Sequence, residues 1–269
     1  MGAPAEPWVE TLKTVMLIFG VVLVACFVSP WSFDKLSFSW DTIKSSKEST
    51  EKLIPLLIGG TGLLAVVLSL LPLTVSVRGV AAAFLGMIPI ALQTFLLGEL
   101  SWQGAIGFVG FVTLIPGLLL RSQYHSALAA RIMVTIGVLC LLLPYLVPPG
   151  DPIPLIGLLK SIGSAPGKAK LLPIIEVVWI LLTLLALLAW LPPPGTAGAK
   201  VLAWVFIARP FFDPLVTTLL TADLAQLGPA LKAGFFLIFL LPLVLMAWTA
   251  LNGYGCASVI GKSLEHSEG

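Results

Sequence analysis

A chain of 269 residues in which 58% are hydrophobic and only 10% are charged is too apolar to form a water-soluble domain of this size. Soluble domains average about 25% charged residues, because most of their surface faces water. The net charge is only +2, whereas nucleic-acid-binding proteins carry an excess of basic residues that contact phosphates. The composition therefore excludes a water-soluble domain and a nucleic-acid-binding protein, and it indicates a protein embedded in a lipid bilayer.

Long apolar runs, closed by charged residues, proline or glycine, follow one another along the chain. A run of about 20 residues crosses the hydrocarbon layer as a helix, which pairs every backbone polar group internally. Eight spans are predicted, at residues 12–29, 53–74, 79–98, 103–120, 131–148, 171–191, 200–222 and 230–251. Six or seven spans remain if the short run 103–120 or the interrupted run 200–222 does not cross. The sequence thus predicts an all-α polytopic membrane protein.

Two of the predicted connections are long, at residues 30–52 and 149–170. The first alternates apolar and polar residues from Trp31 to Trp40, and the second is rich in proline and leucine. Such segments are typical of amphipathic elements that lie along a membrane surface. The alternative is that both connections bind a partner protein.

These connections also suggest an internal duplication. The string Lys52-Leu-Ile-Pro-Leu-Leu resembles Lys170-Leu-Leu-Pro-Ile-Ile, and each follows a long connection. The predicted unit has four helices, so both copies enter the membrane from the same side and form a parallel repeat. We therefore predict a first repeat at 1–126, a second at 127–251 and a polar C-terminal tail at 252–269. The alternative is chance similarity in a chain rich in proline and leucine.

The basic residues indicate an orientation. A cytoplasmic N-terminus places Lys13, Arg78, Arg121 and Arg131 on the cytoplasmic side, where positive charge is enriched in membrane proteins. Several lysines in the two long connections weaken this argument, since they then lie outside. We expect the N-terminus to be cytoplasmic.

Glycine clusters predict faces on which helices approach closely, because a missing side chain shortens the distance between helix axes. Two such clusters lie in the second and fourth predicted spans. They consist of Gly59, Gly60 and Gly62, and of Gly104, Gly107 and Gly110. Near the end of the last span, Trp248 is interpreted as an aromatic residue at the membrane boundary.

The one conspicuous polar motif lies near the centre of the seventh run and reads Ala208-Arg-Pro-Phe-Phe-Asp-Pro214. Arg209 and Asp213 are four residues apart and share one helix face, which predicts an ion pair. Pro210 and Pro214 each remove a backbone donor, which predicts a break in the helix. A broken helix with freed carbonyls and paired charges is a common way to build a substrate or ion site in transporters.

Two further residues are candidates for such a site. Gln93 lies in the stretch of the first repeat that corresponds to the motif and is one of few polar residues in the spans. Glu176, in the sixth span, is an alternative partner for Arg209. The competing interpretation is structural: the charges of Arg209 and Asp213 only fix helix packing, or the run forms two short helices with hydrated charges.

The sequence contains no recognisable catalytic or cofactor motif. The cysteines Cys26, Cys140 and Cys256 lie far apart, which predicts neither a disulfide framework nor a metal site. No cofactor is expected. We therefore predict a non-enzymatic membrane subunit or scaffold that packs with other membrane components in the bilayer. The alternative is a transporter or channel organised around Arg209 and Asp213; an enzyme acting on lipids requires Arg209, Glu176 and His125 around one cavity.

Overall fold

The structure is a computed structural model, which describes residues 7–34, 36–45, 49–96, 102–123, 128–147, 154–164, 166–191, 195–221 and 234–267. Most of these residues are helical. The α-helices are α1 Pro7–Val28, α2 Ser39–Ser45, α3 Ser49–Leu70, α4 Val75–Leu96, α5 Trp102–Gln123, α6 Leu128–Leu146, α7 Pro154–Ser164, α8 Leu171–Leu185, α9 Gly195–Thr221 and α11 Leu241–Ser267. The shorter elements are the strands β1 Pro30–Ser32 and β2 Ser37–Phe38, the 3₁₀ turns η1 Gly167–Lys170 and η2 Ala186–Trp190, and the π-helical turn η3 Phe236–Leu240.

Within the described residues, seven helices are long and apolar enough to cross a membrane. These candidate spans lie at Trp8–Val28, Lys52–Leu70, Ala105–Gln123, Leu128–Leu146, Leu171–Trp190, Ala197–Thr218 and Phe236–Leu264. They include the two runs on which the predicted number of spans depended. The remaining predicted span matches α4, whose described apolar stretch is Val75–Ala91. The prediction of an all-α, multi-pass membrane protein is therefore supported, whereas the number eight is not established.

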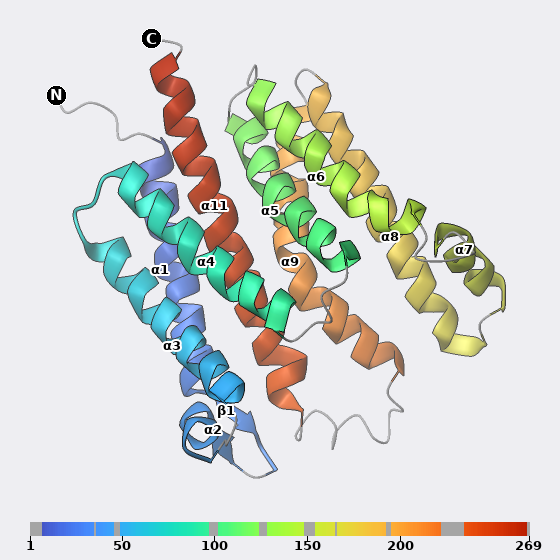
Figure 1. The fold of residues 1–269 in the computed structure, drawn as a ribbon, viewed down its shortest axis with the longest axis horizontal. Helices are drawn as coiled ribbons and strands as arrows, with labels where there is room; N and C mark the ends of the chain where they lie inside the picture. The colour runs from blue at the N-terminus through green and yellow to red at the C-terminus, as the bar shows by residue number, and fades with distance from the viewer. Residues whose placement is uncertain are drawn as a thin grey trace.

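The helices form two groups side by side (Figure 1). One group contains α1, α3, α4 and α11, and the other contains α5, α6, α8 and α9. The most extensive helix–helix contacts join α4 with α11, α5 with α6, and α1 with α3, and α11 also contacts α1, α5 and α9. Each group thus takes one helix from the opposite half of the chain, so the groups do not coincide with the predicted units 1–126 and 127–251.

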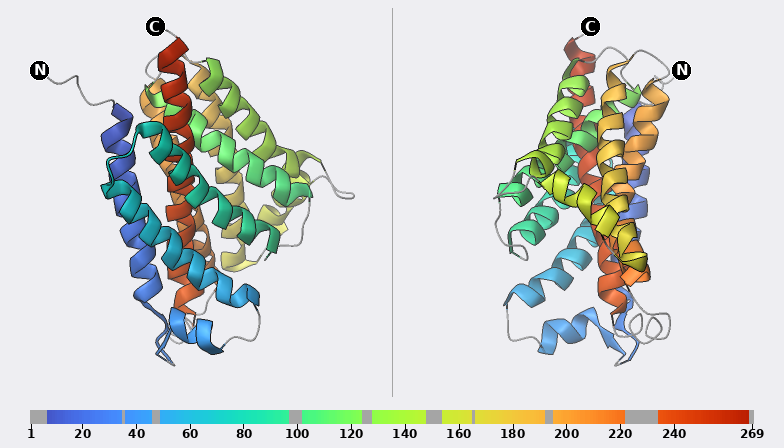
Figure 2. Two further views of the ribbon diagram at one scale, coloured as in Figure 1. Left: turned by 60° about the vertical axis from the view of Figure 1, so that its left-hand side comes forward. Right: turned by 90° about the vertical axis from the view of Figure 1, so that its right-hand side faces the viewer.

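The first long connection folds into a small structure at the end of the bundle opposite to the start of α1 and the end of α11 (Figure 2). Strands β1 and β2 pair antiparallel, and α2 follows. The Trp31 ring stacks on Phe236 with centroids 3.9 Å apart, and its Nε1 donates to the Cys26 carbonyl at 3.2 Å. Ser39 Oγ donates to the Phe27 carbonyl at 2.6 Å. These contacts fasten the connection to the end of α1 and to η3, which directly precedes α11.

Arg78 and Arg121, two of the basic residues that indicate the orientation, cap helix ends. Arg78 NH2 donates to the Leu71 carbonyl at 2.8 Å at the end of α3. Arg121 donates from Nε to the Ala189 carbonyl at 2.6 Å and from NH2 to the Leu191 carbonyl at 2.7 Å. Both side chains are buried. Each guanidinium thus pairs with a carbonyl group that a helix end leaves without a backbone partner. This structural role accounts for the two buried arginines, and a contact with lipid headgroups is not needed to explain them.

The C-terminal segment differs from the predicted polar tail. Helix α11 continues through residue 252 to Ser267, and Asn252 and Ser258 are buried. Trp248 is also buried, with its Nε1 donating to Thr61 Oγ1 of α3 at 2.9 Å, so it does not mark a membrane boundary. The physical reason is the position of α11 between other helices, where polar side chains find protein partners. Asn252 Nδ2, for example, donates to the Ala83 carbonyl at 3.2 Å.

Candidate functional site

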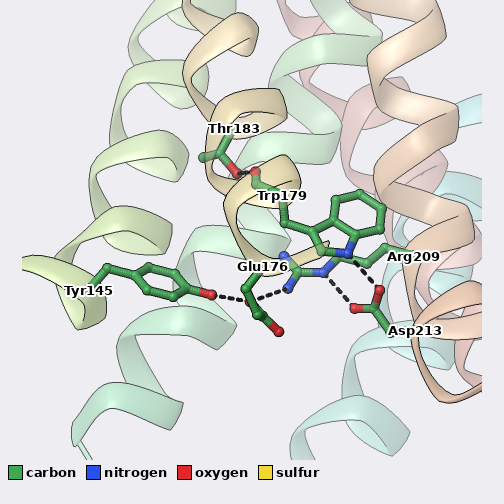
Figure 3. A network of polar contacts seen from close by, with 6 residues as sticks. All are labelled: Tyr145, Glu176, Trp179, Thr183, Arg209 and Asp213. Carbon is green, nitrogen blue, oxygen red and sulfur yellow. Dashed lines mark hydrogen bonds and ion pairs between the residues drawn. The ribbon is translucent and has the colours of Figure 1, made fainter. Parts of the chain in front are cut away.

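A cluster of polar and aromatic side chains joins three helices (Figure 3). Arg209 and Asp213 come from α9, Glu176 and Trp179 from α8, and Tyr145 from α6. The four-residue spacing on α9 and the three-residue spacing on α8 place each pair on one helix face. Both faces point toward each other, and the end of α6 completes the cluster.

Arg209 lies at the centre of the cluster. Its Nε donates to Asp213 Oδ2 at 2.9 Å, and its NH2 lies 4.0 Å from Glu176 Oε2. Its Cζ lies 4.6 Å from the centroid of the Trp179 ring, a cation–π distance. The guanidinium is therefore held by a carboxylate of its own helix and by two side chains of α8.

Further hydrogen bonds fix the groups around Arg209. Trp179 Nε1 donates to Asp213 Oδ1 at 2.6 Å, so both carboxylate oxygens of Asp213 accept a bond. The Tyr145 hydroxyl donates to Glu176 Oε2 at 2.7 Å. Because these bonds cross from α6 to α8 and from α8 to α9, the cluster holds three helices in register.

The cluster is partly exposed and acidic. The exposed fraction of the side chain is 19% for Arg209, 33% for Asp213 and 42% for Glu176. The carboxyl groups of Asp213 and Glu176 flank the single guanidinium of Arg209. Glu176 is five residues from the start of α8, roughly 7.5 Å along the helix axis. The cluster therefore lies toward one end of α8, where water can hydrate the second carboxylate.

The structure answers part of the prediction made for these residues. The ion pair between Arg209 and Asp213 is present, and the alternative pairing with Glu176 is present with it. The side chain of Gln93 lies outside the described part of α4, and His125 lies outside the described residues altogether. The arrangement that an enzyme acting on lipids requires includes His125, so it lies partly outside the described residues.

Helix α9 differs from the broken helix expected at Pro210 and Pro214. It runs as one helix from Gly195 to Thr221 across both prolines. Each proline leaves the carbonyl four residues earlier without its helical partner, but the rest of the helix can retain its geometry. Proline also lies inside α3, α4, α5 and α6, so an internal proline does not mark a helix end in this chain.

Two cavities lie on either side of this part of α9. The first is a groove of about 550 Å³ on α8 and α9, lined by Trp179, Lys200, Val201, Trp204, Val205, Ala208 and Phe212. The second has about 210 Å³ and lies among α4, α5, α9 and α11, with Pro210 in its lining. Neither of these two cavities is lined by Arg209 or Asp213. The charges therefore face protein groups rather than either cavity.

Two members of the cluster, Tyr145 and Trp179, were not predicted from the sequence. The spacing of Trp179 from Glu176 is a usable signal, because residues three apart share a helix face. Tyr145 offers no such signal, since its contact with Glu176 depends on how α6 and α8 pack. Its hydrogen bond is a tertiary feature.

The described residues contain no group of three or more His, Cys, Asp or Glu side chains that could hold a metal ion. The three cysteines are unpaired with one another. Comparisons of the chain with known protein families, curated proteins and solved structures find no match. The features that bear on function are therefore the cluster, the groove and the cavity lined by α4, α5, α9 and α11, called the internal cavity below.

Proposed function

We propose that the chain is a non-enzymatic subunit of a membrane protein complex, and that an apolar helix of a partner subunit packs in the groove on α8 and α9. The observation that supports this most directly is the coupling of the groove to the polar cluster. Trp179 forms part of the groove lining and is also bonded to Asp213 and stacked on Arg209.

The shape of the groove fits a helix. Part of the groove lining is a stripe along α9, formed by residues at four-residue spacing: Lys200, Trp204, Ala208 and Phe212. Ala208 is small and lies between the large side chains of Trp204 and Phe212, which leaves a hollow. Small residues between bulky ones let membrane helices approach closely. Lys200 at one end favours a partner that carries an acidic residue at that level.

The polar cluster supports this interpretation because it fixes one wall of the groove. Trp179 is only 9% exposed, and its indole is held by a hydrogen bond and a cation–π contact. A wall that is fixed before binding loses little conformational entropy when a partner packs against it. Charged residues beside an apolar groove thus have a structural purpose.

Crosslinking tests the docking proposal. We expect a photoreactive benzoylphenylalanine at Val201, in the groove, to form a protein adduct of one discrete mass in native membranes. The matched control is Leu63 on α3, since Val201 is 63% exposed and Leu63 is 61% exposed. The change Ala208→Trp fills the hollow and is expected to remove the adduct. Lipid adducts alone, or the same protein adduct from both positions, contradict the proposal.

A transporter or channel organised around Arg209 and Asp213 is the second candidate. The internal cavity favours it, because Pro210 lines that cavity and neighbours Arg209 on α9. If this candidate is correct, purified protein in liposomes conducts protons or potassium ions, and the double variant Arg209→Gln, Asp213→Asn loses that flux. A dye-based flux assay measures this, and flux that survives in the double variant excludes the candidate.

The contacts between helices support a parallel duplication, and we also propose eight crossings and a cytoplasmic N-terminus, as the sequence predicts. The contacts of α11 with α4 and α1 correspond to the contacts of α5 with α9 and α6. This correspondence is expected if each repeat places its fourth helix in the group formed by the other. Superposition of α1, α3 and α4 on α6, α8 and α9 tests the duplication. Labelling of a cysteine at Leu36 by an impermeant maleimide from outside tests the orientation.

A further inference from the structure

The internal cavity of about 210 Å³ is lined by residues from both helix groups. Four helices contribute to it: α4, α5, α9 and α11. Most of its lining is apolar and includes the aromatic rings of Phe108 and Phe111 on α5. The lining from α11 is different, because it includes Thr249 and Asn252.

Among the described residues that line this cavity, Thr249 and Asn252 alone have polar side chains. They are three residues apart on α11 and share one face. Both residues are almost fully buried, with exposed fractions of 6% and 3%. Polar side chains at this depth in a membrane protein normally have a protein partner or a functional reason to be there.

The hydrogen-bonding capacity of these two side chains is not used up. The hydroxyls of Thr61, Thr113 and Thr183 donate to backbone carbonyls of their own helices. The Thr249 hydroxyl makes no such bond among the described residues. Asn252 uses its Nδ2 toward the Ala83 carbonyl and the Cys256 sulfur, which leaves its amide oxygen as an acceptor. The cavity wall therefore offers one hydroxyl and one amide oxygen.

We propose that this cavity binds a small lipophilic phenol that enters from the bilayer. An apolar cavity of about 150 Å³ in another protein holds benzene, so the larger volume here accommodates a substituted ring. The aromatic body packs against Phe108 and Phe111, and the phenol hydroxyl donates to the amide oxygen of Asn252 and accepts from Thr249. This site is separate from the groove on α8 and α9 and does not depend on the docking proposal.

Fluorine NMR of the protein in lipid nanodiscs tests the site with two probes. The probes are 4-(trifluoromethyl)phenol and 4-(trifluoromethyl)toluene, which differ in the hydroxyl group, and empty nanodiscs supply the signal from partitioning into lipid. We expect saturable binding of both probes to the protein, with the phenol bound about fivefold more tightly, because one net hydrogen bond contributes about 1 kcal/mol.

Two variants localise this binding. A Cβ placed on Gly107, which lines the cavity, has no neighbouring atom within 4 Å, so Gly107→Leu is expected to fill the cavity and abolish saturable binding. Gly60 on α3 is equally open, and Gly60→Leu is the matched control that retains binding. Thr249→Val keeps the side-chain shape but removes the hydroxyl, and it is expected to weaken phenol binding severalfold while leaving the toluene unchanged.

Three results overturn the proposal. The first is an absence of saturable binding, which means that water or neighbouring side chains occupy the space. The second is equal affinity for the two probes, which means that Thr249 and Asn252 do not contact the ligand. The third is saturable binding that survives Gly107→Leu, which places the probe elsewhere on the protein.

Discussion

Replacing Gly86 with leucine is expected to destabilise the protein far more than the same change at Gly60. Gly86 lies where the backbones of α4 and α11 meet. A Cβ at this position overlaps the carbonyl oxygen of Trp248 and lies 2.5 Å from the backbone nitrogen of Asn252. Because backbone atoms cannot rotate away as a side chain can, the helices must separate. We expect a loss of about 3 kcal/mol in the free energy of unfolding, which is the upper end of the range for substitutions that overpack a protein interior.

Thermal unfolding of the purified protein in detergent measures this effect. A fluorogenic thiol reagent reports unfolding through Cys26, which is buried in α1. Gly60→Leu is the control, since a Cβ on Gly60 meets no atom within 4 Å. Gly255, on the α11 side of the same interface, should respond as Gly86 does, because a Cβ there overlaps the backbone of Ala83. Equal unfolding temperatures for the Gly86 and Gly60 variants contradict this account of the interface.

Helix positions could be predicted from the sequence because the length of an apolar run directly reflects the thickness of the hydrocarbon layer. The prediction that the glycine clusters form helix-packing faces was correct for some of their residues. Gly59, Gly62 and Gly110 pack against neighbouring helices, whereas Gly60 and Gly107 face open space, and Gly104 has no described side-chain environment. Which face of a helix meets a neighbour depends on the packing of the whole bundle. A glycine alone does not determine it.

The extent of α11 could not be predicted for a related reason. Its last part contains polar residues that resemble a tail, because hydropathy treats every polar side chain as though it faced lipid or water. In the structure Asn252 bonds to α4 and Ser258 bonds within α11. A helix surrounded by other helices tolerates such residues, and its position in the bundle is a tertiary property.

The candidate site was partly accessible from sequence. Arg209 and Asp213 could be paired because helical spacing brings residues four apart together. Glu176 could be named only as an alternative, since its distance from Arg209 depends on the packing of α8 against α9. The groove and the internal cavity could not be predicted, because both are formed by side chains from separate helices.

Replacing Arg209 with glutamine is expected to weaken both the bundle and the groove. The change leaves Asp213 and Glu176 without their positive partner and removes the cation–π contact with Trp179. Breaking a fully buried ion pair costs about 3–5 kcal/mol, and an exposed pair contributes at most about 1 kcal/mol. Because the carboxylates are 33% and 42% exposed, we expect a loss of about 2 kcal/mol in unfolding free energy.

A double-mutant cycle separates the ion pair from other effects of the substitution. Thermal unfolding compares the single variants Arg209→Gln and Asp213→Asn with the double variant. The double variant should lose less unfolding free energy than the sum of the losses in the two single variants. Arg209→Lys retains the charge but not the planar group that stacks on Trp179, so it should recover only part of the stability. In the crosslinking assay, Arg209→Gln should also reduce the adduct formed from Val201, because the Trp179 wall is no longer fixed. Strictly additive losses together with an unchanged adduct contradict the role assigned to the cluster, since they mean that the charges neither stabilise one another nor position the groove.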